Sequence, residues 1–189
     1  MKAIRRLVVI ILATLVLCLA ISWCLREFDF RTASFAFLLN WLVVSWVRVV
    51  FEVASISFGE GYFRPRAFER EGRTYEYLGV RIFKKLMLNR ISTILNASLR
   101  FSGRLDSLKQ LETATRAAET AHAIVFLMML LPTAYALTKG WLDAAGWMML
   151  FNIPLNMYPV MLQRYNRMRL QRLMQKRRFH RPMSINGGS

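Results

Sequence analysis

The sequence predicts an all-α integral membrane protein with about four transmembrane helices. Hydrophobic residues make up 55% of its 189 residues, which is above the average for soluble domains. The formal net charge is nevertheless +16, because apolar runs alternate along the chain with basic segments. A nucleic-acid-binding protein more often carries such a charge on a mostly polar chain. We therefore expect a lipid membrane as partner and no nucleic acid.

The first two spans are expected at residues 7–25 and 34–56. Residues 7–25 hold no charged side chain, and this length crosses about 30 Å of hydrocarbon. A basic start before an apolar run is also compatible with a signal peptide. The run is long for that and lacks a clear cleavage site, so we interpret it as a retained span. The second span contains Asn40, Arg48 and Glu52.

A basic, amphipathic segment is expected between the second and third spans, over residues 57–119. Its residues 80–88 mix apolar and basic side chains, which is typical of a segment that lies among lipid headgroups. Residues 89–103 are expected as a loop. The start of a helix is expected near Arg104.

The third and fourth spans are expected at residues 120–137 and 144–162. The connection between them is short, so they should run antiparallel. The fourth span contains Asn152, Pro154, Asn156 and Pro159. Prolines and amides within a span predict a broken or kinked helix that lines a polar cavity.

The distribution of charge predicts the topology of the chain. The tail, residues 164–181, carries seven Arg and one Lys and no acidic residue, and residues 182–189 are expected to be a flexible C-terminus. With four spans, the N-terminus, the 57–119 segment and the tail all lie on one side, which the positive-inside rule assigns to the cytoplasm. We expect one membrane domain, residues 1–181, in the bacterial inner membrane with both termini cytoplasmic.

Chemistry is most strongly indicated where the third span begins. Glu112, Arg116, Glu119 and His122 are spaced by four, three and three residues, which places them on one face of a helix. A carboxylate beside an imidazole can fix its tautomer and raise its basicity, as a general base requires. The alternative is a polar pair at the membrane interface. An E-x-x-H motif that occurs once does not predict a di-iron site, so no metal is expected.

Two further groups of polar residues lie outside the expected spans. Gln163–Arg169 comes directly after the fourth span, where Arg can bind phosphate or carboxylate and Tyr and Asn offer directional hydrogen bonds. The alternative is a cationic anchor on lipid phosphates. Phe68–Tyr75 precedes Val80–Lys85, and its alternative is an ordinary charged surface turn.

Three motifs together resemble one family of membrane enzymes. They are F-E-x-x-G-x-x-Y at Phe68–Tyr75, V-R with following lysines at Val80–Lys85, and T-R-x-A-E-x-x-H at Thr115–His122. The pattern resumes at Asn156 and at Gln163–Leu170. Over about residues 60–173 the chain resembles the glycosyl-4,4'-diaponeurosporenoate acyltransferase family of carotenoid biosynthesis.

The resemblance implies an acyltransferase that esterifies a hydroxyl group of a glycosylated lipid with a fatty acyl chain. It implies an acyl donor such as acyl-CoA as co-substrate, a glycosylated lipid acceptor and no cofactor. On this hypothesis His122 is the base and Glu119 its orienting partner. The residues expected to bind substrate are Asn156, Arg164, Tyr165, Asn166, Arg167, Glu69, Arg73 and Arg81.

Two other classes of function remain open at this point. One is another lipid-modifying membrane enzyme, such as a small methyltransferase, although we find no convincing cofactor motif. The other is a non-catalytic membrane scaffold in which Glu119 and His122 are structural.

Overall fold

A computed structural model describes residues 2–54, 56, 58–86 and 105–179. These residues form helices and their connections, and no strand occurs among them. The all-helical fold class is thus confirmed. The loop predicted at 89–103, the ending predicted at 182–189 and His180 lie outside the described residues.

The chain divides into two compact units, which are described separately. Unit 1 comprises residues 1–63 and 117–161, and unit 2 comprises residues 64–116 and 162–189. The helix α6, Leu105–Thr138, contributes its first turns to unit 2 and the rest to unit 1. The residues directly before Leu105 lie outside the described part of the chain, so the helix start near Arg104 stays a prediction.

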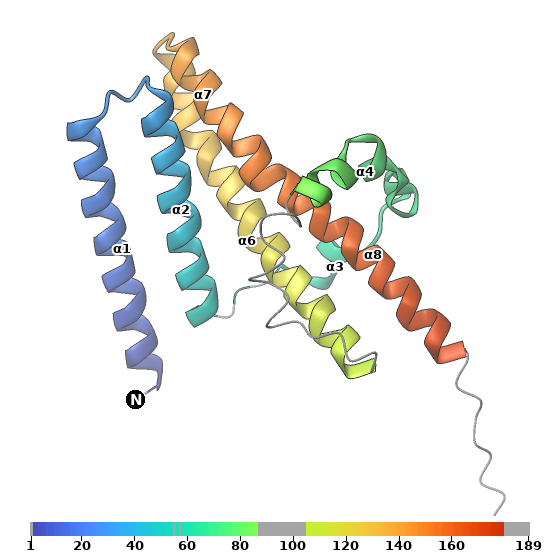
Figure 1. Cartoon of the computed structure of the whole chain (residues 1–189). Helices are drawn as coiled ribbons and strands as arrows, with labels where there is room; N and C mark the ends of the chain where they lie inside the picture. The colour runs from blue at the N-terminus through green and yellow to red at the C-terminus, as the bar shows by residue number, and fades with distance from the viewer. Residues whose placement is uncertain (1, 55, 57, 87–104, 180–189) are drawn as a thin grey trace, which may run out of the picture. The chain divides into compact units, whose positions relative to one another are not determined.

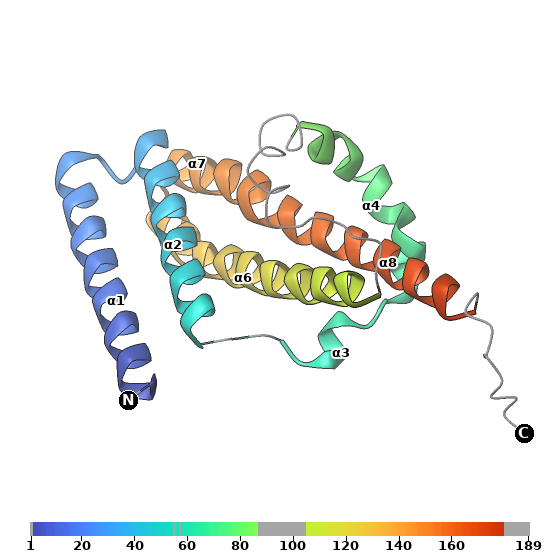
Figure 2. The ribbon, with the colours of Figure 1, turned by 60° about the horizontal axis from the view of Figure 1, so that its bottom comes forward.

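Unit 1 is built mainly from apolar helices that pack side by side (Figures 1 and 2). They are α1 (Lys2–Glu27), α2 (Ala33–Ala54), most of α6, and α7 (Leu142–Asn152), with the single turn α3 (Glu60–Phe63). Three helices in the described residues are long and apolar enough to cross a membrane: α1, α2 and the 108–138 part of α6. The expected fourth span, 144–162, is helical throughout but divided. Its function as a span stays a prediction.

The core of unit 1 joins all four helices. Phe35 and Val47 of α2 pack with Met129 of α6, Met148 of α7 and Cys24 of α1, and all are buried. These contacts give each helix close van der Waals packing against its neighbours, which is a main source of association between helices in lipid. The second half of α6 is therefore held against its neighbours through its buried face.

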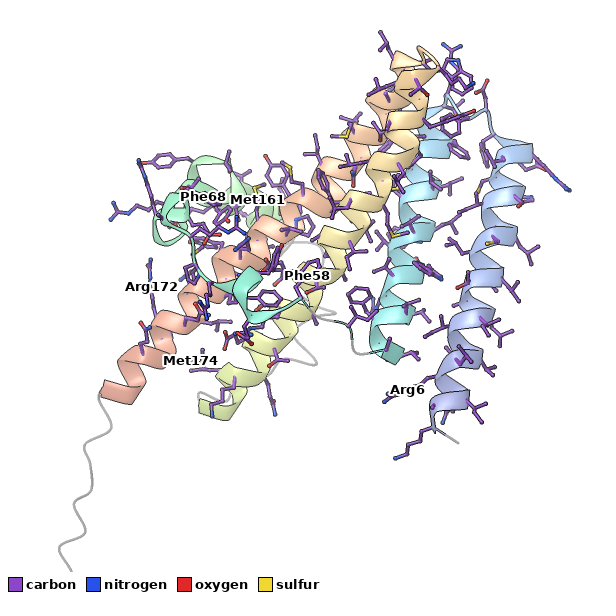
Figure 3. All side chains as sticks on the ribbon, turned by 180° about the vertical axis from the view of Figure 1, so that it is seen from behind. Arg6, Phe58, Phe68, Met161, Arg172 and Met174 are labelled. Carbon is purple, nitrogen blue, oxygen red and sulfur yellow. The ribbon has the colours of Figure 1, made fainter. Side chains whose placement is uncertain are left out.

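The outer face of α1 is apolar and contacts no other helix among the described residues. Leu12, Val16 and Leu19 are more than half exposed, and Figure 3 shows the side chains of this helix, with Arg6 near its basic end. Water disfavours such a surface, whereas lipid tails do not. The exposure fits the predicted role of residues 7–25 as a span.

Both short connections of unit 1 lie together at one end. Arg31, between α1 and α2, forms an ion pair with Asp143 at the start of α7, with Nη2 2.8 Å from Oδ2. Beside it, Phe30 packs on Tyr135 and Trp141. The arrangement predicted from charge requires these two connections on the same side of the membrane, and the structure places them in contact.

A π-helical turn interrupts the last helix of unit 1. α7 continues into the π turn η2, Ile153–Met157, and then into α8, Tyr158–Phe179. Pro154 has no amide hydrogen and cannot complete the regular α-helical bonding pattern, so a local widening of the helix follows. The break predicted in this segment is therefore a π turn within an otherwise continuous helix.

Unit 2 consists of short helices and the charged parts of two long ones. It contains η1 (Ala67–Gly72), α4 (Arg73–Tyr77), a helical stretch at 80–86, the first turns of α6, and α8 from residue 162 onward. Gly72 separates η1 from α4 with φ of 99°, a conformation that favours glycine. A Cβ there would lie 3.1 Å from the ring of Tyr165, so glycine also permits close packing against α8.

Candidate functional site

A cluster of side-chain amides is buried inside unit 1. Asn40 of α2, Asn152 of α7 and Asn156 of η2 are each 0% exposed. They come from the apolar segments that the sequence singled out for their internal amides. Burial of an amide costs free energy unless the amide is hydrogen-bonded, so we expect these three side chains to form hydrogen bonds.

The amides are joined by hydrogen bonds in a defined direction. The Nδ2 of Asn152 donates to the backbone carbonyl of Phe126 at 3.1 Å. The Nδ2 of Asn156 donates to Asn152 Oδ1 at 2.9 Å and to Asn40 Oδ1 at 3.0 Å. The network thus connects α2, α6, α7 and η2, and it fixes the position of the Asn156 side chain.

The imidazole of His122 lies at the end of this network. Its Nδ1 is 3.3 Å from Asn156 Oδ1. The side chain as a whole is half-buried. The structure therefore brings together His122 and Asn156, two of the residues predicted for the site.

Glu119 lies one turn before His122 on α6 and is fully buried, as is Thr120 beside it. The sequence predicted that Glu119 orients the imidazole. The ring partner that the structure shows is instead the amide of Asn156, and pairing of Glu119 with the imidazole stays a prediction.

A buried carboxylate organises the predicted site residues of unit 2. Glu69 is 1% exposed, and it accepts hydrogen bonds from the backbone amide of Arg66 at 2.8 Å and the hydroxyl of Tyr75 at 2.7 Å. The Nε of Arg164 lies 2.8 Å from Glu69 Oε1 as an ion pair. Two blocks far apart in sequence, at 66–75 and at 164, therefore meet at one carboxylate.

A second acidic residue holds the neighbouring side chain of α8. The hydroxyl of Tyr165 donates to Glu76 Oε1 at 2.8 Å, and Arg81 approaches Glu76 Oε2 at 3.6 Å. Arg81 is largely exposed whereas Glu76 is half-buried. The sequence predicted substrate contacts for Tyr165 and Arg81, and the structure adds Glu76 as their common partner.

The polar stripe on the first turns of α6 reaches α8 within unit 2. Glu112 Oε1 accepts from Arg116 Nη2 and from Gln171 Nε2, each at 3.0 Å. The prediction that Glu112 and Arg116 share one face of a helix is thus confirmed, and the two side chains form an ion pair. Its function in the structure is to join two helices.

Two cationic side chains of unit 2, Lys84 and Arg169, interact electrostatically with each other. Lys84 Nζ lies 3.4 Å from Asn166 Oδ1, and the Arg169 guanidinium lies over the Tyr165 ring at 5.7 Å. Burial lowers the pKa of Lys84, and the nearby charge of Arg169 lowers it further. Two cations that disfavour each other attract an anionic group, so this part of unit 2 suits a phosphate or a carboxylate.

The remaining predicted residues differ in exposure. Arg73 is exposed, whereas Arg167 is 2% exposed. Asn40, Asn152 and Lys84 were not expected from the sequence to belong to the site, and nothing in the sequence singled out Glu76. Charged or amide side chains within apolar or amphipathic segments were the available signal. Across the described ranges no three His, Cys, Asp or Glu side chains gather as metal ligands.

The fold and these clusters define a helical protein suited to the membrane, with a histidine held by buried amides. Residues 59–176 match the family model of glycosyl-4,4'-diaponeurosporenoate acyltransferase. That match covers more than half of the chain, so the protein belongs to the glycosyl-4,4'-diaponeurosporenoate acyltransferase family. No curated protein and no solved structure matches the chain.

Proposed function

We propose that the protein transfers a fatty acyl chain to a hydroxyl group of a glycosylated, carotenoid-like lipid at the cytoplasmic face of the membrane. Family membership supports acyl transfer. The observation that best supports the proposal within the molecule is the His122 imidazole, half-buried in an apolar helical unit and hydrogen-bonded to a buried amide.

In the proposed reaction His122 acts as the general base. Its imidazole takes the proton of the acceptor hydroxyl while the hydroxyl oxygen forms a bond to the acyl carbonyl carbon. The resulting tetrahedral intermediate expels the thiolate or alkoxide of the donor, which takes the proton from the imidazolium. The base is regenerated, and positioned proton transfer of this kind contributes about 10²–10⁴-fold to a rate.

Unit 2 supports a second requirement, the binding of an anionic group. Arg164 is paired with the buried Glu69, so we assign this pair to positioning of α8 and not to charge neutralisation in the reaction. Lys84, Asn166 and Arg169 carry the cationic and amide groups that fit the phosphate of an acyl donor or a headgroup. Arg73 and Arg81 add exposed positive charge nearby in the chain.

Extracts of cells that make a glycosylated carotenoid acid test the function. The protein is expressed there as the wild type, as His122→Ala and as the control Thr133→Ala, which removes a buried hydroxyl from the same helix. Mass spectrometry should find an acyl ester of the glycolipid with the wild type and the control but not with His122→Ala.

Other results would contradict the proposal in distinct ways. A methylated product would indicate a methyltransferase, and unchanged lipids would favour a scaffold. An acyl ester formed equally well by His122→Ala would leave acyl transfer standing but would reject His122 as the base. Equal insertion of the variants into the membrane is checked by immunodetection.

A further inference from the structure

A neutral imidazole carries its proton on one ring nitrogen and its lone pair on the other. The tautomer therefore decides which nitrogen of His122 can act as a base. A hydrogen-bond network determines the tautomer when one end of the network is a group that can only donate or only accept a hydrogen bond.

The amide network of unit 1 has such an end at the backbone of α6. The carbonyl of Phe126 can only accept a hydrogen bond, so the atom of Asn152 that lies 3.1 Å from it is the amide nitrogen. The oxygen of Asn152 must then face Asn156. This oxygen accepts from the Asn156 Nδ2 at 2.9 Å.

Asn156 is oriented in turn by its two acceptors. Its Nδ2 has two hydrogens, and it lies 3.0 Å from Asn40 Oδ1 as well as 2.9 Å from Asn152 Oδ1. Both hydrogens are thereby used. The Asn156 oxygen is left facing Nδ1 of His122 at 3.3 Å, and an amide oxygen only accepts.

We propose that Asn156 is a positioning residue that holds neutral His122 as the Nδ1–H tautomer and so leaves the lone pair on Nε2. The inference rests on the proposed function for its catalytic meaning, since Nε2 would be the atom that takes the hydroxyl proton. The direction of the network is set by the Phe126 carbonyl, four residues along α6 from the histidine itself.

Asn40 completes the network without anchoring it. Its Oδ1 accepts from Asn156, whereas its Nδ2 has no hydrogen-bond partner in the described part of the chain. Rotation of the Asn40 amide is therefore less restricted than that of Asn152. The anchor that excludes the other orientation of Asn156 is Asn152.

The test is nitrogen NMR of ¹⁵N-histidine-labelled protein in lipid nanodiscs. The chain has two histidines, so a His180→Ala background leaves His122 as the only labelled residue. Once the ring is neutral, Nδ1 should show the signal of a protonated nitrogen and Nε2 that of an unprotonated one. A neutral ring protonated on Nε2, or a ring that stays doubly protonated wherever the protein is folded, would overturn the proposal.

Three variants separate positioning from mere stability. Asn156→Ala removes the side-chain acceptor and leaves the backbone of Leu155, which also hydrogen-bonds the ring, so the fraction of the Nδ1–H tautomer should fall. Asn156→Asp keeps an acceptor oxygen at the ring, so it should retain the Nδ1–H tautomer even if its thermal stability falls. Asn152→Ala does not touch the ring but releases the Asn156 amide, and it should also lower this fraction. Thr133→Ala, which loses a hydrogen bond to its own helix, should leave the spectrum unchanged.

Acyl transfer by the same samples gives a second readout. Asn156→Ala should lower kcat by about 10–100-fold, by analogy with the loss of the hydrogen-bond partner that orients a metal-ligating histidine, with a smaller change in KM. The NMR result does not depend on activity. An Nδ1–H tautomer in a protein without acyl transfer would reject the proposed function alone, and an unchanged tautomer in Asn156→Ala would reject the positioning role alone.

Discussion

Replacement of Glu69 by alanine should strongly destabilise unit 2. The carboxylate is 1% exposed and meets three groups: the Arg66 amide, the Tyr75 hydroxyl and the Arg164 guanidinium. Arg164 is itself 8% exposed. Glu69→Ala therefore leaves a buried cation without this counter-charge.

The magnitude follows from the kind of contact that is lost. Breaking one side of a buried ion pair costs about 3–5 kcal/mol, because the other charge stays buried. A hydrogen bond to a charged group contributes about 1.5–3 kcal/mol. Glu69→Ala should thus cost about 3–5 kcal/mol, and Tyr75→Phe, which keeps the ion pair, about 1.5–3 kcal/mol.

Hydrogen exchange of backbone amides in residues 66–77 measures this locally. The matched control is Tyr77→Phe. Tyr77 is 86% exposed, so this substitution should change the opening free energy of the segment very little. A double-mutant cycle with Glu69→Ala and Arg164→Ala should be strongly non-additive, since each single variant strands the partner of the other.

Two results would refute this reasoning. One is a Glu69→Ala variant whose segment opens with an unchanged free energy. The other is strict additivity of Glu69→Ala and Arg164→Ala, which would mean that the two charges do not depend on each other in the folded protein.

Two further predictions concern Gly72 and the Arg31–Asp143 pair. Gly72→Ala forces φ of 99° on a residue with a Cβ, and that Cβ would lie 3.1 Å from the Tyr165 ring. In a thermal unfolding assay it should therefore destabilise unit 2 by at least about 1–2 kcal/mol. The control Gly59→Ala, which has open space around it, should leave the stability unchanged. Hydrogen bonding to Arg31 lowers the pKa of Asp143, so the pair's contribution is present above the unfolded pKa of about 3.8 and is lost as the pH falls through the lower folded value. Asp143→Asn should abolish that acid-dependent part of the unfolding curve, and an unchanged curve would show that the pair does not contribute.

The helices were largely predictable because their signals are local. An uncharged run such as residues 7–25 predicts a span by length alone, and the helix α1 covers the whole of it. The π turn could be predicted only as a break in the helix. Pro154 shows that one backbone hydrogen bond is missing, but the sequence does not determine which backbone conformation results.

The sequence predicted which residues belong to the candidate site better than it predicted which of them contact each other. Spacing along one helix suggested Glu119 for His122, whereas the partner that the structure shows, Asn156, lies 34 residues away in sequence. Contacts of that kind depend on how helices pack. The same holds for Arg164, whose charge suggested a substrate anion but which meets Glu69 of the same unit.

Acyl transfer and the role of His122 are tested together with purified protein in nanodiscs, supplied with an isotope-labelled acyl-CoA and a glycosylated carotenoid acid. We expect the wild type to transfer label to the acceptor as an ester, and His122→Ala to do so about 10²–10⁴-fold more slowly while remaining folded. Transfer by His122→Ala at the wild-type rate would contradict this expectation.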